Sequence, residues 1–211
     1  MIDDITPPKK FAHVVLKTSQ LKAQLEFYQT LLGARIVHQA PGIVFLSYDD
    51  EHHRLAITER PGLLPKPKNM VGVDHHAYTY ENLEDLLTTW QRMTQADHQP
   101  LWCTHHGGTI SIYYKDCDGN VVETQVDVFD SIEETNEFLV SEDFRSNPIG
   151  VDFDPQALLD RLKQGEPWAS IKLREPSGPR DPATIPKAYL GQFAWTMLQI
   201  KSLFARKQTE V

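Results

Sequence analysis

The sequence has few cysteines and does not begin like a secreted protein. Cys103 and Cys117 are its only cysteines among 211 residues. Two thiols in an acidic chain are more often reduced than paired, so we do not expect a disulfide framework. The first residues, Met1–Asp4, include two acids where a secretory signal needs a basic end and an apolar stretch. These features predict a reducing, cytoplasmic environment.

Long apolar runs and an excess of basic residues are also missing. The run Ile43–Leu46 is typical and is far too short to span a bilayer, so we expect no membrane partner. The 29 acidic residues outnumber the 21 basic ones and give a net charge of -8. Such a surface repels phosphate backbones, so we also expect no nucleic-acid partner. The remaining composition, 40% hydrophobic and 24% charged, is that of an ordinary soluble globular protein.

The order of the expected elements occurs twice along the chain. β-Branched and apolar stretches predict strands, and apolar residues at helical spacing predict a helix after the first strand of each set. The first set has strands at 11–18, 34–39, 43–48 and 53–59, with a helix from Ser19 to Gly33. The second has strands at 74–80, 100–105, 109–115 and 121–128, with a helix that Asn82 caps. We therefore predict an α+β fold in residues 1–128. Two βαβββ modules, at about 10–60 and 73–128, would form a half-open mixed β-barrel.

Residues 129–211 have a different pattern and predict a C-terminal helical extension. Helices are expected to begin at Asp130–Ser131 and at Asp154–Pro155, and a last helix to run from Pro186 to about Arg206. The extension could pad the outside of the barrel and build a contact between subunits of a homo-oligomer, or form a lid over the cavity. The first interpretation is favoured.

Histidine is the one unusually frequent residue that can carry chemistry. His13 and His75 occupy equivalent places in the first strands of the two modules, and Glu123 lies in the last strand of the second. If the sheets face one another, all three side chains can point into one cavity. Two imidazoles and one carboxylate form a ligand set that suits non-haem Fe(II) and leaves positions open. Spacing alone also allows His13 and Glu123 to be incidental strand residues, with Glu123 exposed to solvent.

Three segments resemble the vicinal oxygen chelate superfamily, over about residues 10–128. They are Phe11–Leu16 with the helix residues Leu25–Gly33, then Asp74–Tyr78, and finally Asp116–Glu123, which is similar to a "DPDGN..E" motif. The superfamily includes glyoxalase I, fosfomycin-resistance and bleomycin-resistance proteins, and type I extradiol dioxygenases. The resemblance implies that His13, His75 and Glu123 hold a divalent ion, and its register selects His75 over the adjacent His76.

Two further stretches resemble those of the extradiol dioxygenases with a single pair of modules. In Glu51–Ala56 a double histidine is similar to one whose second member, here His53, is the active-site acid/base. Ser111–Tyr113 is similar to a strand whose tyrosine stands ten residues before the liganding glutamate. Another active-site histidine lies upstream of that tyrosine in the family. Either His105 or His106 occupies this region, and we favour His106.

The resemblance therefore implies an Fe(II)-dependent extradiol dioxygenase that uses O2 to cleave the ring of a catechol-type aromatic, of which a biphenyl-diol is one candidate. Mn(II) suits the same ligands. The implied catalytic residues are His53, Tyr113 and His106, and substrate binding is assigned to His105 and His76. Two alternatives stay open. One is a glyoxalase-like metal-dependent lyase or isomerase, and the other is a metal-free ligand-binding protein of the bleomycin-resistance type.

Overall fold

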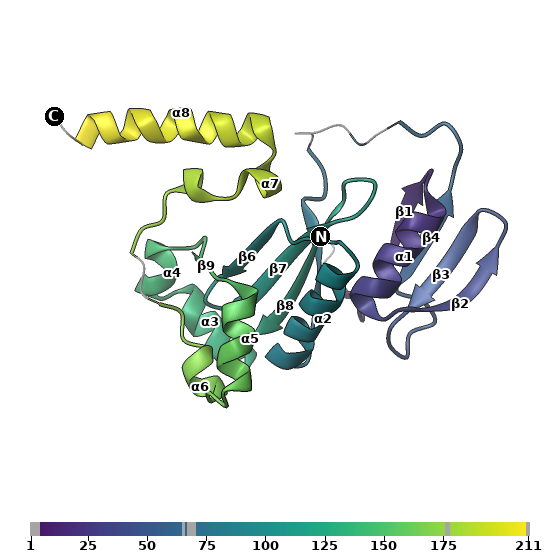
Figure 1. Ribbon diagram of the computed structural model, residues 1–211, viewed down its shortest axis with the longest axis horizontal. Coiled ribbons are helices and arrows are strands. Elements are labelled where there is room, and N and C mark those ends of the chain that lie inside the picture. The colour runs from purple at the N-terminus through teal and green to yellow at the C-terminus, as the bar shows by residue number, and fades with distance from the viewer. Residues whose placement is uncertain (1–4, 65, 67–70, 176–177, 210–211) are drawn as a thin grey trace. The chain divides into compact units, whose positions relative to one another are not determined.

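The computed structural model describes residues 5–64, 66, 71–175 and 178–209 (Figure 1). Contacts along the chain divide it into two units, Met1–Pro65 and Lys66–Val211. Each unit contains one of the two predicted modules, and the C-terminal extension belongs to the second. The units are described one at a time below.

The first unit is a four-stranded mixed sheet with one helix. Its strand order is β1 (Val14–Thr18), β4 (Leu55–Glu59), β3 (Ile43–Ser47) and β2 (Arg35–Ala40). Strand β1 runs parallel to β4, and the other pairs are antiparallel. Helix α1 (Leu21–Leu32) connects β1 to β2 and ends at Gly33, whose φ of 61° is left-handed. The buried core lies between helix and sheet and includes Phe27, Tyr28, Leu31, Val44, Leu46, Leu55 and Ile57.

The second unit repeats this plan with one additional strand. Its order is β5 (His75–Thr79), β8 (Val121–Asp127), β7 (Thr109–Lys115), β6 (Trp102–His105) and β9 (Val151–Asp152). Strands β5 and β8 are parallel, and the others are antiparallel. Helix α2 (Leu83–Gln95) begins at Asn82, whose side chain accepts the backbone N–H of Asp85 as predicted. The prediction of two βαβββ modules in an α+β fold is confirmed. Neither of the described sheets closes into a barrel.

Two details near the first sheet differ from the prediction. Strand β1 begins at Val14 rather than at residue 11, so His13 directly precedes the strand. Helix α1 begins after Gln20 rather than Ser19, because the Thr18 side chain accepts the Gln20 N–H and shifts the turn by one residue. Both differences are shifts at element ends, where local hydrogen bonds rather than hydrophobic periodicity decide the boundary.

The extension is helical, as predicted, but its last helix is interrupted. Gly191 separates α7 from α8 with φ 76° and ψ 163°, a backbone conformation that glycine adopts readily and other residues rarely do. The single helix predicted from Pro186 is therefore two. The helical segments of the extension are α3 (Ile132–Leu139), α4 (Glu142–Ser146), α5 (Pro155–Lys163), α6 (Trp168–Ile171), η1 (Pro182–Thr184), α7 (Lys187–Leu190) and α8 (Gln192–Thr209).

Among the strands of the described residues, only the short β9 was not predicted from the sequence. It adds only two residues to the edge of the second sheet, beside β6. Two residues are too few to show an alternating pattern. Among the helices of the described ranges, none has the length and apolar character needed to cross a membrane.

Candidate metal and substrate site

In the first unit, His13 and His53 lie in contact. Their ring centroids are 4.4 Å apart, and the Phe45 ring packs against His53 at 4.8 Å in a T-shaped arrangement. His53 lies in the connection between β3 and β4, and its Nδ1 lies 2.6 Å from Nδ1 of His52. Burial, together with the neighbouring His13 and His52, lowers the pKa of His53. His53 is therefore neutral at pH 7 and able to accept a proton.

His13 has a buried nitrogen that lacks a partner. Its Nδ1 is inaccessible to solvent and makes no hydrogen bond to any residue that the structure describes. A buried polar atom in this condition costs free energy, and an acceptor nitrogen can avoid the cost by binding a cation. This atom is consistent with the predicted ligand role of His13.

In the second unit, four neighbouring strands place a row of side chains on one face of the sheet. Glu123 of β8 lies opposite Ala77 of β5 on one side and opposite Tyr113 of β7 on the other. Tyr113 in turn lies opposite Trp102 of β6. His75 is two residues before Ala77, so it projects from this same face. The structure thus brings together His75, Glu123 and Tyr113, all three of which the sequence predicted.

Hydrogen bonds connect the members of this row. Nε2 of His75 lies 3.0 Å from Oε2 of Glu123, and the Tyr113 hydroxyl donates to Oε1 of the same carboxylate at 2.9 Å. Nδ1 of His75 lies 2.7 Å from Oδ2 of Asp74. Glu123 is only 5% exposed. The alternative that Glu123 is a solvent-exposed strand residue is therefore wrong.

His106 extends the network beyond Tyr113. Its Nδ1 lies 2.6 Å from the Ile149 carbonyl oxygen and must donate to it, because a carbonyl only accepts. Its Nε2 lies 2.9 Å from the Tyr113 hydroxyl. Burial lowers the pKa of His106, so the ring is neutral and Nε2 is an acceptor. The single hydroxyl hydrogen of Tyr113 can then serve either Glu123 or His106, which provides a short path for a proton.

His75 and Glu123 form an ion pair in the metal-free protein. The hydrogen bond to Glu123 is the main cause that raises the pKa of His75 to about 9, and the hydrogen bond to Asp74 adds to it. Partial burial acts in the opposite direction. Burial alone would raise the pKa of Glu123, but hydrogen bonds from His75 and other neighbours bring it below its ordinary value. A cation that binds this pair has to displace the proton of His75, because only neutral imidazole is a metal ligand.

This ion pair predicts a pH-dependent stability for the metal-free protein. The pKa of His75 rises from 6.5 in the unfolded chain to about 9 in the folded one, so the folded state holds this proton more tightly. The stabilisation is complete below pH 6.5 and disappears as the pH rises through 9. We expect the loss to be about 1 kcal/mol, because partial exposure screens the pair.

Urea unfolding with a chelator at pH 6.5 and pH 9 measures this effect. The matched variant His75→Gln keeps a polar side chain but cannot titrate, so it should lose less stability than the parent chain over this range. Equal losses in the two proteins would contradict the assignment.

His105 and His76 lie on the opposite sides of their strands from the site. Both ring nitrogens of His105 are bonded to backbone, since Nδ1 accepts from Gly107 N–H at 3.0 Å and Nε2 lies 3.1 Å from the Lys172 carbonyl oxygen. Burial lowers its pKa to about 4. The prediction that His106 rather than His105 lies beside Tyr113 agrees with this geometry. The backbone hydrogen bonds of His105 favour a structural role for that residue. His76 alternates with His75 and packs against Tyr78 at 5.6 Å.

The sequence analysis missed three residues around this site. Trp102 stacks on Tyr113 with ring centroids 5.4 Å apart, and its place in β6 was the only available signal. Asp74 directly precedes the ligand His75 and could have been proposed as its partner. Tyr189 of α7 donates to Asp74 at 2.6 Å. No local pattern connects a residue of the extension with one that lies 115 positions earlier.

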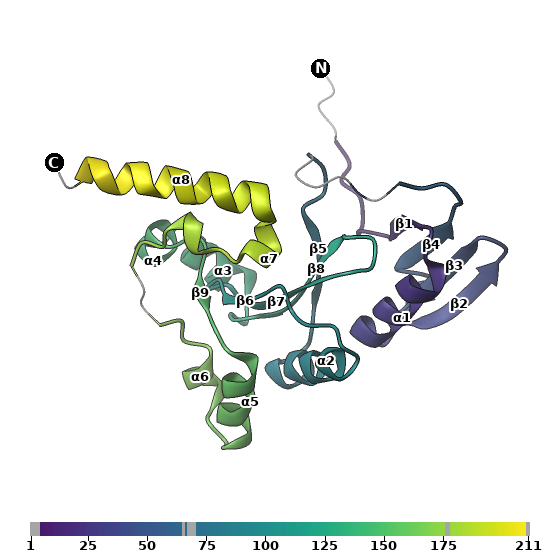
Figure 2. The same cartoon turned by 45° about the horizontal axis from the view of Figure 1, so that its top comes forward.

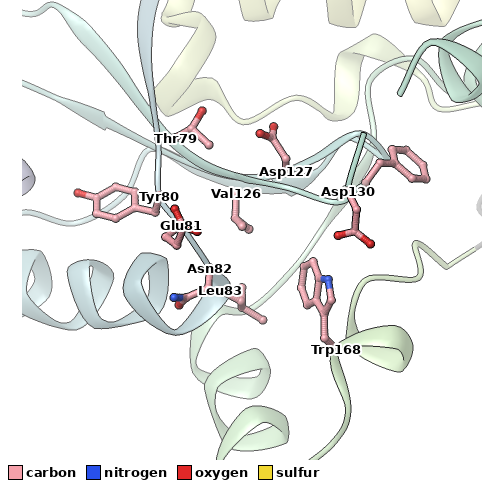
Figure 3. Close-up of a pocket in the computed structure, with 10 residues that line it drawn as sticks. Thr79, Tyr80, Glu81, Asn82, Leu83, Val126, Asp127, Asp130 and Trp168 are labelled. Carbon is pink, nitrogen blue, oxygen red and sulfur yellow. The ribbon is translucent and has the colours of Figure 1, made fainter. Parts of the chain in front are cut away.

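A separate pocket lies at the other end of β5 and β8. It has a volume of about 380 Å³ and contains the carboxylates of Glu81, Asp127 and Asp130, with Trp168 of α6 at its edge (Figure 3). His75 stands at the first position of β5, whereas Thr79, which lines this pocket, stands at the last. The pocket is therefore distinct from the His75–Glu123 site.

Comparison with known proteins places the fold in a family. Residues 10–124 match the Glyoxalase/Bleomycin resistance protein/Dioxygenase superfamily. The chain belongs to this superfamily. The match contains all three predicted ligands, from His13 to Glu123. A solved structure of lactoylglutathione lyase from Agrobacterium tumefaciens is 20% identical, with a TM-score of 0.45, and covers 57% of this chain and 96% of that one.

Two superfamily members from Rhodococcus globerulus are similar over most of the chain. Biphenyl-2,3-diol 1,2-dioxygenase 2 is 38% identical over 164 residues, which is 77% of this chain and 86% of the relative. Biphenyl-2,3-diol 1,2-dioxygenase 3 is 37% identical over 172 residues, which is 81% of this chain and 90% of the relative. Both matches are longer than the 128 residues of the two modules, so they include part of the extension.

Proposed function

We propose that this chain is an Fe(II)-dependent extradiol dioxygenase that cleaves the ring of a catechol-type aromatic, with a biphenyl-diol as the first candidate. The observation that carries the proposal is the pair of the half-buried His75 and the buried Glu123, to which Tyr113 and His106 are hydrogen-bonded in series. The resemblance to two biphenyl-2,3-diol dioxygenases supports both the reaction and the substrate class.

The side chains fit the proposed ion. The first unit contributes His13, with its unpartnered buried Nδ1, and the second contributes the pair His75 and Glu123, so the proposed ligand set is two imidazoles and one carboxylate. When bound, Fe(II) would lower the pKa of a coordinated hydroxyl and supply the redox chemistry that a reaction between the diol and O2 needs. Mn(II) accepts the same donors. The convergence of His13 with the pair in the other unit is part of the proposal.

The protein side chains would bind the diol and move its protons. His53, which is neutral at pH 7, would accept a hydroxyl proton and return it later in the reaction. The Tyr113 hydroxyl oxygen would take a proton from a substrate hydroxyl as its own proton passes to Nε2 of His106, and the reverse transfer would return it.

A direct assay tests this proposal. The protein is purified without oxygen in the presence of Fe(II) or Mn(II), its bound metal is measured, and catechols and biphenyl-diols are added in air. We expect a stoichiometric ion and a yellow ring-fission product. Turnover of a hemithioacetal with no effect on diols would indicate the lyase alternative, and ligand binding without bound metal would indicate the bleomycin-resistance type. A homo-oligomer in the cytoplasm stays a prediction.

Tyr113→Phe should lower turnover without removing the metal. The variant keeps the ring that packs against Trp102 but loses the hydroxyl that Glu123 and His106 share. We expect kcat to fall by about 10²-fold, as for the loss of one positioned proton donor, while metal content stays stoichiometric.

Tyr114→Phe is the matched control for this variant. Tyr114 is the next residue on β7, and its buried hydroxyl makes no hydrogen bond to any described residue. Its removal should leave kcat within a factor of about two, because no interaction is lost. Equal kcat values for Tyr113→Phe and Tyr114→Phe would remove Tyr113 from the proposed chemistry.

A further inference from the structure

The segment that follows α6 lies against the site face of the second unit. Arg180 donates to both carboxylate oxygens of Asp152 at 2.8 Å, and its guanidinium lies 5.8 Å from the centre of the Trp102 ring. Further along, α7 lies beside β6 and β7 (Figure 2), where its Tyr189 ring contacts the rings of Trp102 and Tyr113. The Arg180–Asp152 bidentate pair therefore anchors the connector that delivers α7 to this face.

Tyr189 is the residue of α7 that reaches the centre of this face. Its ring lies 5.1 Å from the ring of Tyr113 and 5.1 Å from that of Trp102. Its hydroxyl donates to Oδ2 of Asp74 at 2.6 Å. The same oxygen accepts from Nδ1 of His75 at 2.7 Å. Asp74 thus connects Tyr189 of the extension to His75 of β5 by two short hydrogen bonds, whereas the direct distance from the Tyr189 hydroxyl to Nδ1 of His75 is longer, at 3.4 Å.

We propose that Tyr189 is a positioning residue for His75, acting through Asp74, and that the extension thereby completes the metal-binding half-site of the second unit. The inference rests on the proposed function, because it assigns His75 to a divalent cation. A carboxylate that holds Nδ1 fixes both the tautomer and the orientation of an imidazole, so that Nε2 points to the ion. In this structure, Nε2 of His75 lies 3.0 Å from the carboxylate of Glu123, the other proposed ligand of the second unit.

Asp74 needs a second partner to hold His75 in this way. The Asp74 side chain is 73% exposed, so without another bond it is free to rotate toward water. The half-buried ring of Tyr189 is confined by Trp102 and Tyr113, so its hydroxyl has little freedom. The tyrosine therefore restrains the carboxylate, and the carboxylate restrains the imidazole.

A purely packing role for the extension does not account for this contact. Packing requires the ring of Tyr189 but not its hydroxyl. The hydroxyl donates to Asp74, the same carboxylate that accepts from His75. Phe193, close by in the sequence on α8, shows the contrast. Phe193 is 64% exposed.

Metal affinity in the full chain tests the proposal. The dissociation constant for Co(II), a spectroscopic substitute for Fe(II), is measured by chelator competition for the parent and for Tyr189→Phe. We expect Tyr189→Phe to raise the dissociation constant about 3- to 10-fold. Asp74→Asn should raise it about 10- to 100-fold, since Asp74 contacts His75 directly. Phe193→Ala is the control and should leave it unchanged.

The double variant distinguishes positioning from packing. If Tyr189 acts through Asp74, Tyr189→Phe should have no further effect once Asp74→Asn is present. Unchanged affinity in Tyr189→Phe, or fully additive effects in the double variant, would overturn the proposal.

A metal-independent measurement separates this inference from the proposed function. Imidazole nitrogen NMR of the metal-free protein should show a single ordered His75 ring in the parent and a shifted or broadened signal in Tyr189→Phe. A parent chain that binds no divalent metal would refute the proposed function, whereas an unchanged His75 signal in Tyr189→Phe would refute the role of Tyr189.

Discussion

Glu123→Gln is expected to abolish stoichiometric iron binding and, with it, turnover. The substitution keeps the size of the side chain and its hydrogen bond to Tyr113, but it removes the anionic ligand. Losing an outer-shell partner of a metal ligand costs about 10- to 100-fold in affinity, and losing a ligand should cost more than that. Because Glu123 is buried, solvent cannot easily provide another ligand in its place.

The same result is expected for His13→Gln, although His13 lies in the other unit. Both variants are compared with His38→Gln, which changes an exposed histidine of β2 that has no predicted role. Metal content by elemental analysis and oxygen uptake are measured on all three. An iron content in His13→Gln or Glu123→Gln equal to that of His38→Gln would show that the three-ligand proposal is wrong.

The second large effect is expected for His53→Gln, which should retain iron and lose turnover. His53 packs against His13 in the first unit, and its lowered pKa keeps it neutral at pH 7, as a base requires. Removal of a positioned acid/base typically costs 10²- to 10⁴-fold, and we expect kcat to fall within about this range.

His52→Gln provides the comparison, because His52 is the other member of the double histidine. His52 is exposed at the turn, whereas His53 is enclosed by Phe45 and His13. We therefore expect a much smaller loss of kcat for His52→Gln. Full activity of His53→Gln, or a larger loss for His52→Gln, would show that the acid/base has been assigned to the wrong residue.

Sequence periodicity was enough to predict most of the fold. The two modules were recognisable because each strand has an apolar run and each helix has a cap or stop, such as Asn82 and Gly33. The resemblance to the superfamily assigned His75, Glu123 and Tyr113 to one site, and strand alternation supported His75 over His76. The register of β7 and β8 then sets Tyr113 directly opposite Glu123.

The contribution of the extension could not be predicted in this way. Tyr189 reaches Asp74 through a chain path of 115 residues, and only tertiary packing brings the two together. The break at Gly191 depends on a backbone conformation that hydrophobic spacing does not reveal. The interpretation of the extension as outside padding therefore missed the tyrosine that it places beside His75.

The ratio of dioxygen consumed to diol cleaved is the most direct measurement of the central claim. An oxygen electrode follows dioxygen uptake by the iron-loaded enzyme while ring-fission product is measured in the same sample, with and without catalase. The account predicts equal amounts of dioxygen and product, unaffected by catalase, because both oxygen atoms enter the product. Oxygen uptake that catalase reduces, or diol consumption without oxygen uptake, would contradict it.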